Sequence, residues 1–120
     1  MGEYYIRKFI DEELSRFMFK KYTKGYRYLI DTVYFAIIDE DAIENMTKNI
    51  FPKVANKYNE ISALHVKWCI NQVIKTMYNN TSMKVISDYF HTELGEKPSL
   101  KFIVYTLVCR YNYAQEELEK

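Results

Sequence analysis

Apolar side chains recur along the chain at the three- and four-residue spacing of amphipathic helices. Residues 3–21 carry one such apolar stripe, which predicts a first helix. A second stripe predicts a helix over residues 24–38, and Thr23 can cap it by accepting a hydrogen bond from a free backbone N–H. The first third of the chain therefore predicts two amphipathic helices.

The middle of the chain predicts three further helices. Asp41 and Glu44, three residues apart, form a capping-box pattern that begins the third helix. Pro52 should end that helix, because proline disfavours helical geometry at the preceding residue and suits the first turn of the next helix. A short helix over residues 52–58 and a longer one over residues 62–78 follow.

The two helices within residues 52–78 are a candidate helix-turn-helix. Ser62 can cap the second of them through its hydroxyl. In a helix-turn-helix the second helix enters the DNA major groove, so one of its faces contacts DNA and the other packs on the rest of the protein. The apolar residues expected on its inward face are Val66, Cys69, Ile70, Val73 and Met77.

The last third of the chain predicts two more helices and a tail. Ser82 opens a short helix, Ser99 or the proline before it starts the final one, and residues 114–120 are expected to fray. We see no repeat, linker or low-complexity segment. We therefore expect one domain over residues 1–120, an all-α bundle of about six helices that is large enough to bury a real core.

Composition agrees with an all-helical protein outside membranes. The 120 residues include only 3 Gly and 2 Pro, so helix breakers are scarce. No apolar run reaches the roughly 20 residues of a membrane span, and no signal peptide is apparent, so we expect a cytoplasmic protein without a membrane partner. Cys69 and Cys109 could form a disulfide, but buried thiols in a reducing cytoplasm fit two helical cysteines better.

Charge is segregated along the chain, although the formal net charge is only +1. Residues 15–29 contain five basic residues and no acid, and residues 50–77 contain four lysines against the single acid Glu60. Such segregation can make one positive face on a nearly neutral protein. The alternative is an ordinary solvated surface.

Several short motifs resemble one family of regulators. They are KGYRYL at 24–29, Thr47-Lys48 followed by Phe51-Pro52, VANKYN at 54–59, Ile86 through Tyr89-Phe90, and Lys97-Pro98-Ser99 with Phe102-Ile103. Over about residues 14–112 the chain resembles the C-terminal DNA-binding domain of the sporulation response regulator, stage zero sporulation protein A. The resemblance implies a helix-turn-helix bundle that binds promoter boxes in double-stranded DNA. Because no receiver domain accompanies the motifs, we expect a stand-alone transcriptional regulator.

The resemblance also implies which residues contact DNA. The family's recognition helix is rich in arginine, and this chain has none there, so we expect a different sequence preference. Asn71 and Gln72 can pair with adenine edges, Trp68 can pack on a thymine methyl or a sugar, and Lys67 and Lys75 can reach phosphates. Lys67, Asn71 and Lys75 share one helical face, for which a purely solvated surface is the alternative. The candidate DNA contacts are Ser62, His65, Lys67, Trp68, Asn71, Gln72, Lys75, Lys53, Lys20, Lys21, Lys24 and Arg27.

Neither a metal site nor an enzyme is expected. His65 and Cys69 lie one helical turn apart and could place two ligands on one metal ion. A structural zinc site takes four ligands, however, and only His91 and Cys109 remain among the soft donors. The chain also lacks a glycine-rich phosphate loop and a nucleophile elbow. We therefore expect no catalytic residues, no metal and no cofactor.

A second hypothesis keeps the fold and changes the partner. A small domain of this kind could be a protein-interaction or inhibitor module, of mobile-element or phage type, that binds a host protein instead of DNA. Exposed aromatic side chains would then serve as anchors. The candidate anchors are Tyr4, Tyr5, Trp68, Tyr105, Tyr111 and Tyr113. The DNA target, and whether the chain forms a homodimer, stay open.

Overall fold

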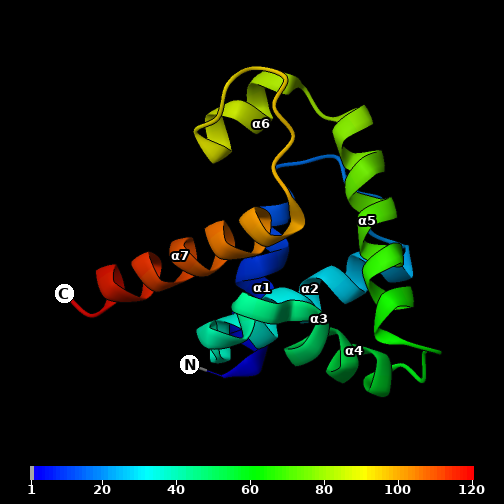
Figure 1. Cartoon of the computed structure of the whole chain (residues 1–120). Coiled ribbons are helices and arrows are strands. Elements are labelled where there is room, and N and C mark those ends of the chain that lie inside the picture. The colour runs from blue at the N-terminus through cyan, green and yellow to red at the C-terminus, as the bar shows by residue number, and fades with distance from the viewer. Residues whose placement is uncertain (1) are drawn as a thin grey trace.

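The computed structural model describes residues 2–120, which form seven α-helices and a 3-10 helix and contain no strand. The prediction of an all-α bundle is confirmed. In Figure 1, α5 and α7 spread apart from a base that contains α1–α4, and α6 lies above the gap between them. The elements are α1 (Glu3–Leu14), α2 (Lys24–Ile38), the 3-10 helix η1 (Glu40–Asn45), α3 (Met46–Asn49), α4 (Phe51–Lys57), α5 (Ala63–Asn80), α6 (Met83–Phe90) and α7 (Leu100–Leu118).

The central element is α2, which packs against α1, α4, α5 and α7. Its buried residues lie on most sides of the helix, as expected for an element surrounded by others. The predicted bounds and cap are confirmed, because the Thr23 side chain accepts a hydrogen bond from the backbone N–H of Tyr26. The helix is therefore a scaffold to which the remaining elements attach.

The apolar core joins all the long helices. Fully burying a large aliphatic or aromatic side chain stabilises the fold by about 1.5–3 kcal/mol, so the residues of this core contribute most of the stability. Its largest fully buried members include Ile10 and Leu14 from α1, Leu29 and Val33 from α2, Phe51 and Val54 from α4, Val66, Ile70 and Met77 from α5, and Ile103 and Leu107 from α7.

The first helix is shorter than its apolar stripe predicted, since α1 ends at Leu14 and not near residue 21. The chain leaves the helix there and brings Phe17 into the core, where its ring stacks on Phe90 of α6 at 5.6 Å between centroids. The backbone N–H of Met18 then donates to the hydroxyl of Thr81, at the end of α5. Contacts with distant residues therefore replace the last helical turns.

The third predicted helix, which was expected to begin at Asp41 and end before Pro52, also differs from the structure. A 3-10 helix occupies residues 40–45, and the short α3 is capped by Asn45, whose side chain accepts from the N–H of Lys48 at 3.1 Å. The Asp41 capping box does not form, because Asp41 lies within the 3-10 helix. α4 begins at Phe51 with Pro52 in its first turn, as proline geometry favours. At the other end, α7 includes residues 114–118, which had been assigned to the frayed tail.

Two buried carboxylates tie the helices together, and the sequence analysis singled out neither. Asp31 of α2 forms ion pairs with Arg7 of α1 and with Lys57 of α4, the latter at 3.0 Å. Glu13 of α1 accepts from Arg110 of α7 at 2.6 Å, and α6 also donates to this carboxylate through a tyrosine hydroxyl. Removing one partner of a buried pair leaves an uncompensated charge, so both clusters constrain how the helices pack.

Within residues 2–120, no helix is both long enough and apolar enough to span a membrane.

Candidate nucleic-acid interface

α4, a five-residue turn and α5 form a helix-turn-helix. The turn reverses at Asn59, which has a φ of 55°, a left-handed conformation that asparagine tolerates better than most residues. The N–H of Glu60 then donates to the carbonyl of Ala55 at 2.8 Å, so one of the unpaired backbone carbonyls at the C-terminal end of α4 gains a hydrogen bond. Ser62 caps α5 as predicted, accepting from the N–H of His65 at 3.1 Å.

α5 buries one side and exposes the other. All five residues predicted for its inward face are buried. The opposite side carries two adjacent rows of exposed side chains, Lys67, Asn71 and Lys75 in one row and Trp68 and Gln72 in the other. We call these five residues the outer face of α5. Lys67 and Lys75 are eight residues apart, so the outer face is about 12 Å long, comparable to the width of the major groove.

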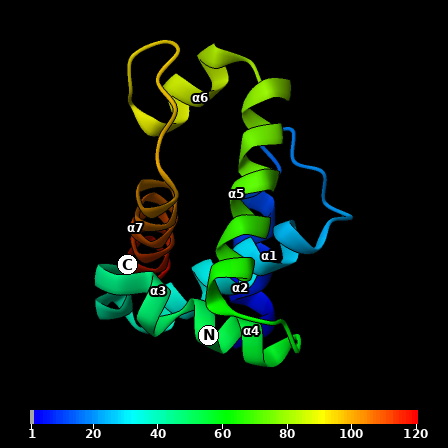
Figure 2. The ribbon, with the colours of Figure 1, turned by 45° about the vertical axis from the view of Figure 1, so that its right-hand side comes forward.

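A close approach of two backbones positions α5 against α2. A Cβ atom at Gly25 would lie 2.4 Å from the carbonyl oxygen of Cys69, a contact that real Cβ atoms do not make. The start of α2 therefore lies on the middle of α5. Figure 2 shows that the loop between α1 and α2 also runs beside α5, on the side of α5 where α2 begins. As a result, Lys20 and Lys24 line one shallow hollow together with Trp68 and Gln72 of the outer face.

The basic residues around this hollow differ in their partners. Lys24 forms an ion pair with Glu60 at 3.2 Å, and Lys21 forms one with Asp11 at 3.1 Å. Among the described residues 2–120, no carboxylate forms an ion pair with Lys67 or Lys75 of the outer face. The outer face therefore carries positive charges that are free for an anionic partner.

Two other candidate DNA contacts lie differently. Lys53 of α4 points to α2, with its ammonium 5.7 Å from the ring centroid of Phe35. Phe35 is ten residues beyond Gly25 on α2, or about 15 Å along the helix, so Lys53 is separated from the hollow. Arg27, by contrast, is exposed one turn after Lys24 and extends the basic end of α2.

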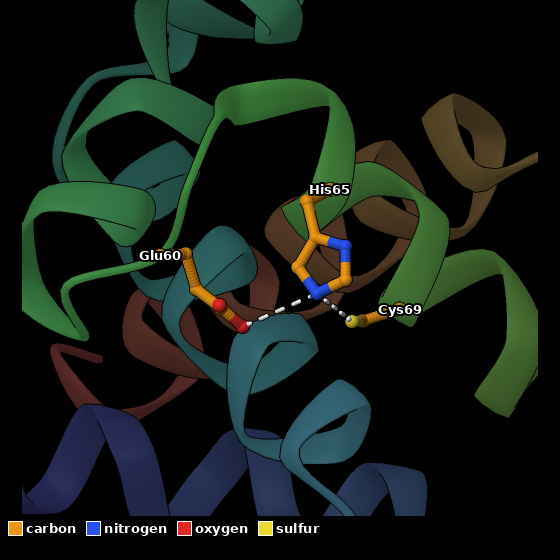
Figure 3. Close-up of side chains that lie close together, drawn as sticks. All are labelled: Glu60, His65 and Cys69. Carbon is orange, nitrogen blue, oxygen red and sulfur yellow. Dashed lines mark hydrogen bonds and ion pairs between the residues drawn. The ribbon is translucent and has the colours of Figure 1, made fainter.

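His65 turns into the protein instead of joining the outer face. Its Nε2 atom lies 3.7 Å from the carboxylate of Glu60 and 3.6 Å from the Sγ atom of Cys69 (Figure 3). Its ring is nearly parallel to that of Trp68, with centroids 6.0 Å apart. His65 therefore stacks on Trp68 as well as contacting Glu60 and Cys69.

Glu60 is a functional candidate that the sequence analysis missed. Its carboxylate accepts a hydrogen bond from the hydroxyl of Tyr28, and this bond, followed by the nearby Lys24, lowers the pKa of Glu60. Cys69 is buried as expected, and burial raises the pKa of its thiol, whereas Cys109 is exposed, so the prediction of two buried thiols is wrong for Cys109. Carboxylates are common on protein surfaces, so an isolated glutamate in a turn gives no metal-ligand signal of the kind that the spacing of His65 and Cys69 gives.

The aromatic anchors of the second hypothesis are mostly exposed. Trp68 is 59% exposed, and Tyr4, Tyr5, Tyr105 and Tyr113 are more than half exposed as well. Tyr111 is only 8% exposed, because its ring packs edge-on against Phe9 of α1 at 5.4 Å. The prediction of an exposed Tyr111 is therefore wrong.

A helical bundle in which a helix-turn-helix presents polar and basic side chains is the architecture of helix-turn-helix DNA-binding domains. Residues 10–108 match the family described as sporulation initiation factor Spo0A C terminal. The chain belongs to this family, whose members are DNA-binding effector domains and not enzymes. The resemblance inferred from the sequence motifs is confirmed.

Proposed function

We propose that the protein is a transcriptional regulator that binds double-stranded DNA with α5 in the major groove. The observation that carries the proposal is the outer face of α5, where Lys67, Asn71 and Lys75 form one exposed row without an ion-pair partner in residues 2–120. Membership in a family of DNA-binding effector domains supports the same partner. We place this activity in the cytoplasm, where Cys69 and Cys109 would remain the free thiols seen in the structure.

The outer face has side chains that can recognise the edges of bases in the major groove. Asn71 and Gln72 offer amides, which pair with adenine through two hydrogen bonds, and Trp68 offers an apolar surface for a thymine methyl or a sugar. Lys67 and Lys75, at the two ends of the row, would bind phosphates on either side of the groove.

The basic end of α2 extends this surface. Lys20 and Lys24 share a hollow with Trp68 and Gln72, so they would bind the phosphate backbone flanking the groove, together with Arg27. Lys53 is left out of this set, since its ammonium lies on Phe35.

Salt dependence of binding to labelled random duplexes tests the proposal. With about five phosphate contacts, affinity measured by fluorescence anisotropy should fall by nearly three decades between 50 and 200 mM salt. The K67A/K75A double variant should reduce the slope by about two contacts, and K53A should retain it. Absent binding, or binding that does not respond to salt, would contradict the proposal.

Sequence preference is a separate readout. Selection from a random duplex pool should give a site that wild-type protein prefers. The fourfold variant K67A/N71A/Q72A/K75A should lose this preference while circular dichroism shows unchanged helix content. A variant that selects the same site would exclude α5 as the reading element.

One observation favours a protein partner as the second candidate. Phe102, Tyr105 and Tyr113 lie along α7 and line, with Phe9 and Phe90, a groove among α1, α6 and α7. Affinity capture from a lysate treated with nuclease distinguishes the two functions. A partner that is retained without nucleic acid and lost in a Y105A/Y113A variant would favour the interaction module.

A further inference from the structure

Three side chains with different donor atoms converge beside the helix-turn-helix turn. Glu60 comes from the turn, and His65 and Cys69 come from the first two turns of α5 (Figure 3). One carboxylate oxygen, one imidazole nitrogen and the thiol sulfur all lie within 4.8 Å of one another. The imidazole Nε2 faces both of the other groups.

The spacing of these atoms fits a tetrahedral zinc ion. With Zn–N at about 2.05 Å and Zn–S at about 2.3 Å, tetrahedral angles place nitrogen and sulfur about 3.6 Å apart. The Nε2–Sγ distance is 3.6 Å. For nitrogen and a carboxylate oxygen the same geometry gives about 3.4 Å, and the Nε2–carboxylate distance is 3.7 Å. The thiol sulfur and the carboxylate oxygen, which lie within 4.8 Å of each other, would have to be about 3.6 Å apart, so the Glu60 carboxylate would move by up to about 1 Å to complete the geometry.

We propose that Glu60, His65 and Cys69 bind one Zn²⁺ ion, with a water molecule as the fourth ligand. Structural zinc sites have four protein ligands, whereas open sites have three and a water molecule; the proposed site is of the open kind, and its mixed sulfur, nitrogen and oxygen set suits this borderline-soft cation. Binding would displace the thiol proton of Cys69 to solvent, and the thiolate and carboxylate would together balance the charge of the ion.

Neighbouring groups support the site and also oppose it. The hydroxyl of Tyr28 donates to Oε2 of Glu60, the carboxylate oxygen that faces His65, and holds this oxygen beside the imidazole, where it would be shared with the ion. The ammonium of Lys24, 3.2 Å from the same carboxylate, is the positive charge that faces the site. Its side chain is 50% exposed, so it can turn to solvent when the ion takes its place.

The site would join the turn of the helix-turn-helix to α5. Glu60 precedes the helix, and the other two ligands lie within it, so the ion would cross-link the turn to the helix that carries the outer face. This site does not depend on DNA binding, because none of the five outer-face residues is a ligand.

Metal titration of the full chain tests the proposal directly. After dialysis against a chelator, Zn²⁺ added in competition with a chromophoric indicator should bind at one ion per chain. Co²⁺ used as a spectroscopic probe should give the sulfur-to-cobalt charge-transfer absorption and the visible bands of a tetrahedral site. No Zn²⁺ binding tighter than about 100 μM would overturn the proposal.

The chain supplies matched controls, because it has one other cysteine and one other histidine. C69S, H65Q and E60Q should each weaken Zn²⁺ binding by about 100-fold or more, since even outer-shell changes cost about 10- to 100-fold. C109S and H91Q should bind as wild type. A charge-transfer band that persists in C69S and disappears in C109S would overturn the assignment.

Thermal unfolding gives an independent readout in which each variant is compared with itself. An ion that binds only the native state raises the unfolding midpoint. Zn²⁺ should therefore raise the midpoint of wild type and C109S but not that of C69S. An equal rise in all three proteins would overturn the proposed ligand set.

Discussion

Gly25 at the start of α2 faces the carbonyl of Cys69 in α5, and the space between the two backbones leaves no room for a side chain. This glycine is the second residue of the KGYRYL motif. Because α2 is surrounded by the other helices, this contact fixes where α5 leaves the bundle, and so where its outer face points.

Replacing Gly25 by alanine should destabilise the protein. The added Cβ would meet the Cys69 carbonyl oxygen at 2.4 Å and Val73 at 3.3 Å, so α2 and α5 must separate. Overpacking of this kind costs about 1–3 kcal/mol in the free energy of unfolding, measured by urea denaturation. G2A is the matched control, since a Cβ at Gly2 meets nothing within 4 Å. Equal stability of G25A and wild type would contradict the close approach.

Asp31 should matter more for stability than its partner Lys57. D31A removes the fully buried carboxylate that accepts from Arg7 and Lys57; because both cations are partly exposed and can turn to water, the cost is that of the lost charged hydrogen bonds, about 2–3 kcal/mol. The side chain of Lys57 is 44% exposed, so K57A should cost only about 1 kcal/mol after solvent screening. Urea denaturation of both variants checks the order. A larger loss in K57A would show that Lys57, and not Asp31, organises the cluster.

Trp68 should report DNA binding, because it is the single tryptophan of the chain and lies on the outer face. Its fluorescence should change as duplex DNA is added, in parallel with the anisotropy of the labelled DNA. W68A should lower the affinity about tenfold, which corresponds to the roughly 1.4 kcal/mol of one good contact. Y113A, an exposed aromatic on α7, is the control and should bind normally. Tryptophan emission that stays constant during binding would exclude Trp68 from the interface.

Acid should destabilise the protein partly through Glu60. Its pKa is lowered in the folded state by the Tyr28 hydroxyl, so the folded protein binds this proton less readily than the unfolded chain. The resulting stability is present above the ordinary glutamate pKa of about 4.3 and is lost as the pH falls through the lower folded value.

Chemical denaturation from pH 7 to pH 3 measures this contribution. E60Q and Y28F should both flatten the acid branch of the stability curve, since each removes one partner of the hydrogen bond. E119Q, near the exposed C-terminal end, should retain the wild-type curve. If E60Q retained the full acid dependence, the Tyr28–Glu60 bond would not contribute to it.

Four helix starts, though not the one expected at Asp41, could be predicted because a capping hydrogen bond involves residues only two or three positions apart. Thr23, Ser62, Ser82 and Ser99 all accept from a backbone N–H in the first turn of their helices. The outer face of α5 could be predicted for a similar reason, since helical periodicity alone separates it from the buried face.

Features that depend on distant residues could not be predicted in this way. The apolar residues after Leu14 have helical spacing, yet Phe17 packs on Phe90, more than 70 positions later. Glu13 lies in a run of charged residues, but its carboxylate accepts from Arg110, 97 positions later. A local pattern identifies which residues are apolar or ionisable; it does not identify their partners across the bundle.

Three contacts made by α2 have a consequence for transplanting the helix-turn-helix. Gly25 receives the backbone of α5, Tyr28 donates to the turn, and Asp31 accepts from the last residue of α4. A peptide of residues 50–80 would lose all three attachments at once. A designer who moves this recognition element to another scaffold must therefore move three helices, with α2 among them.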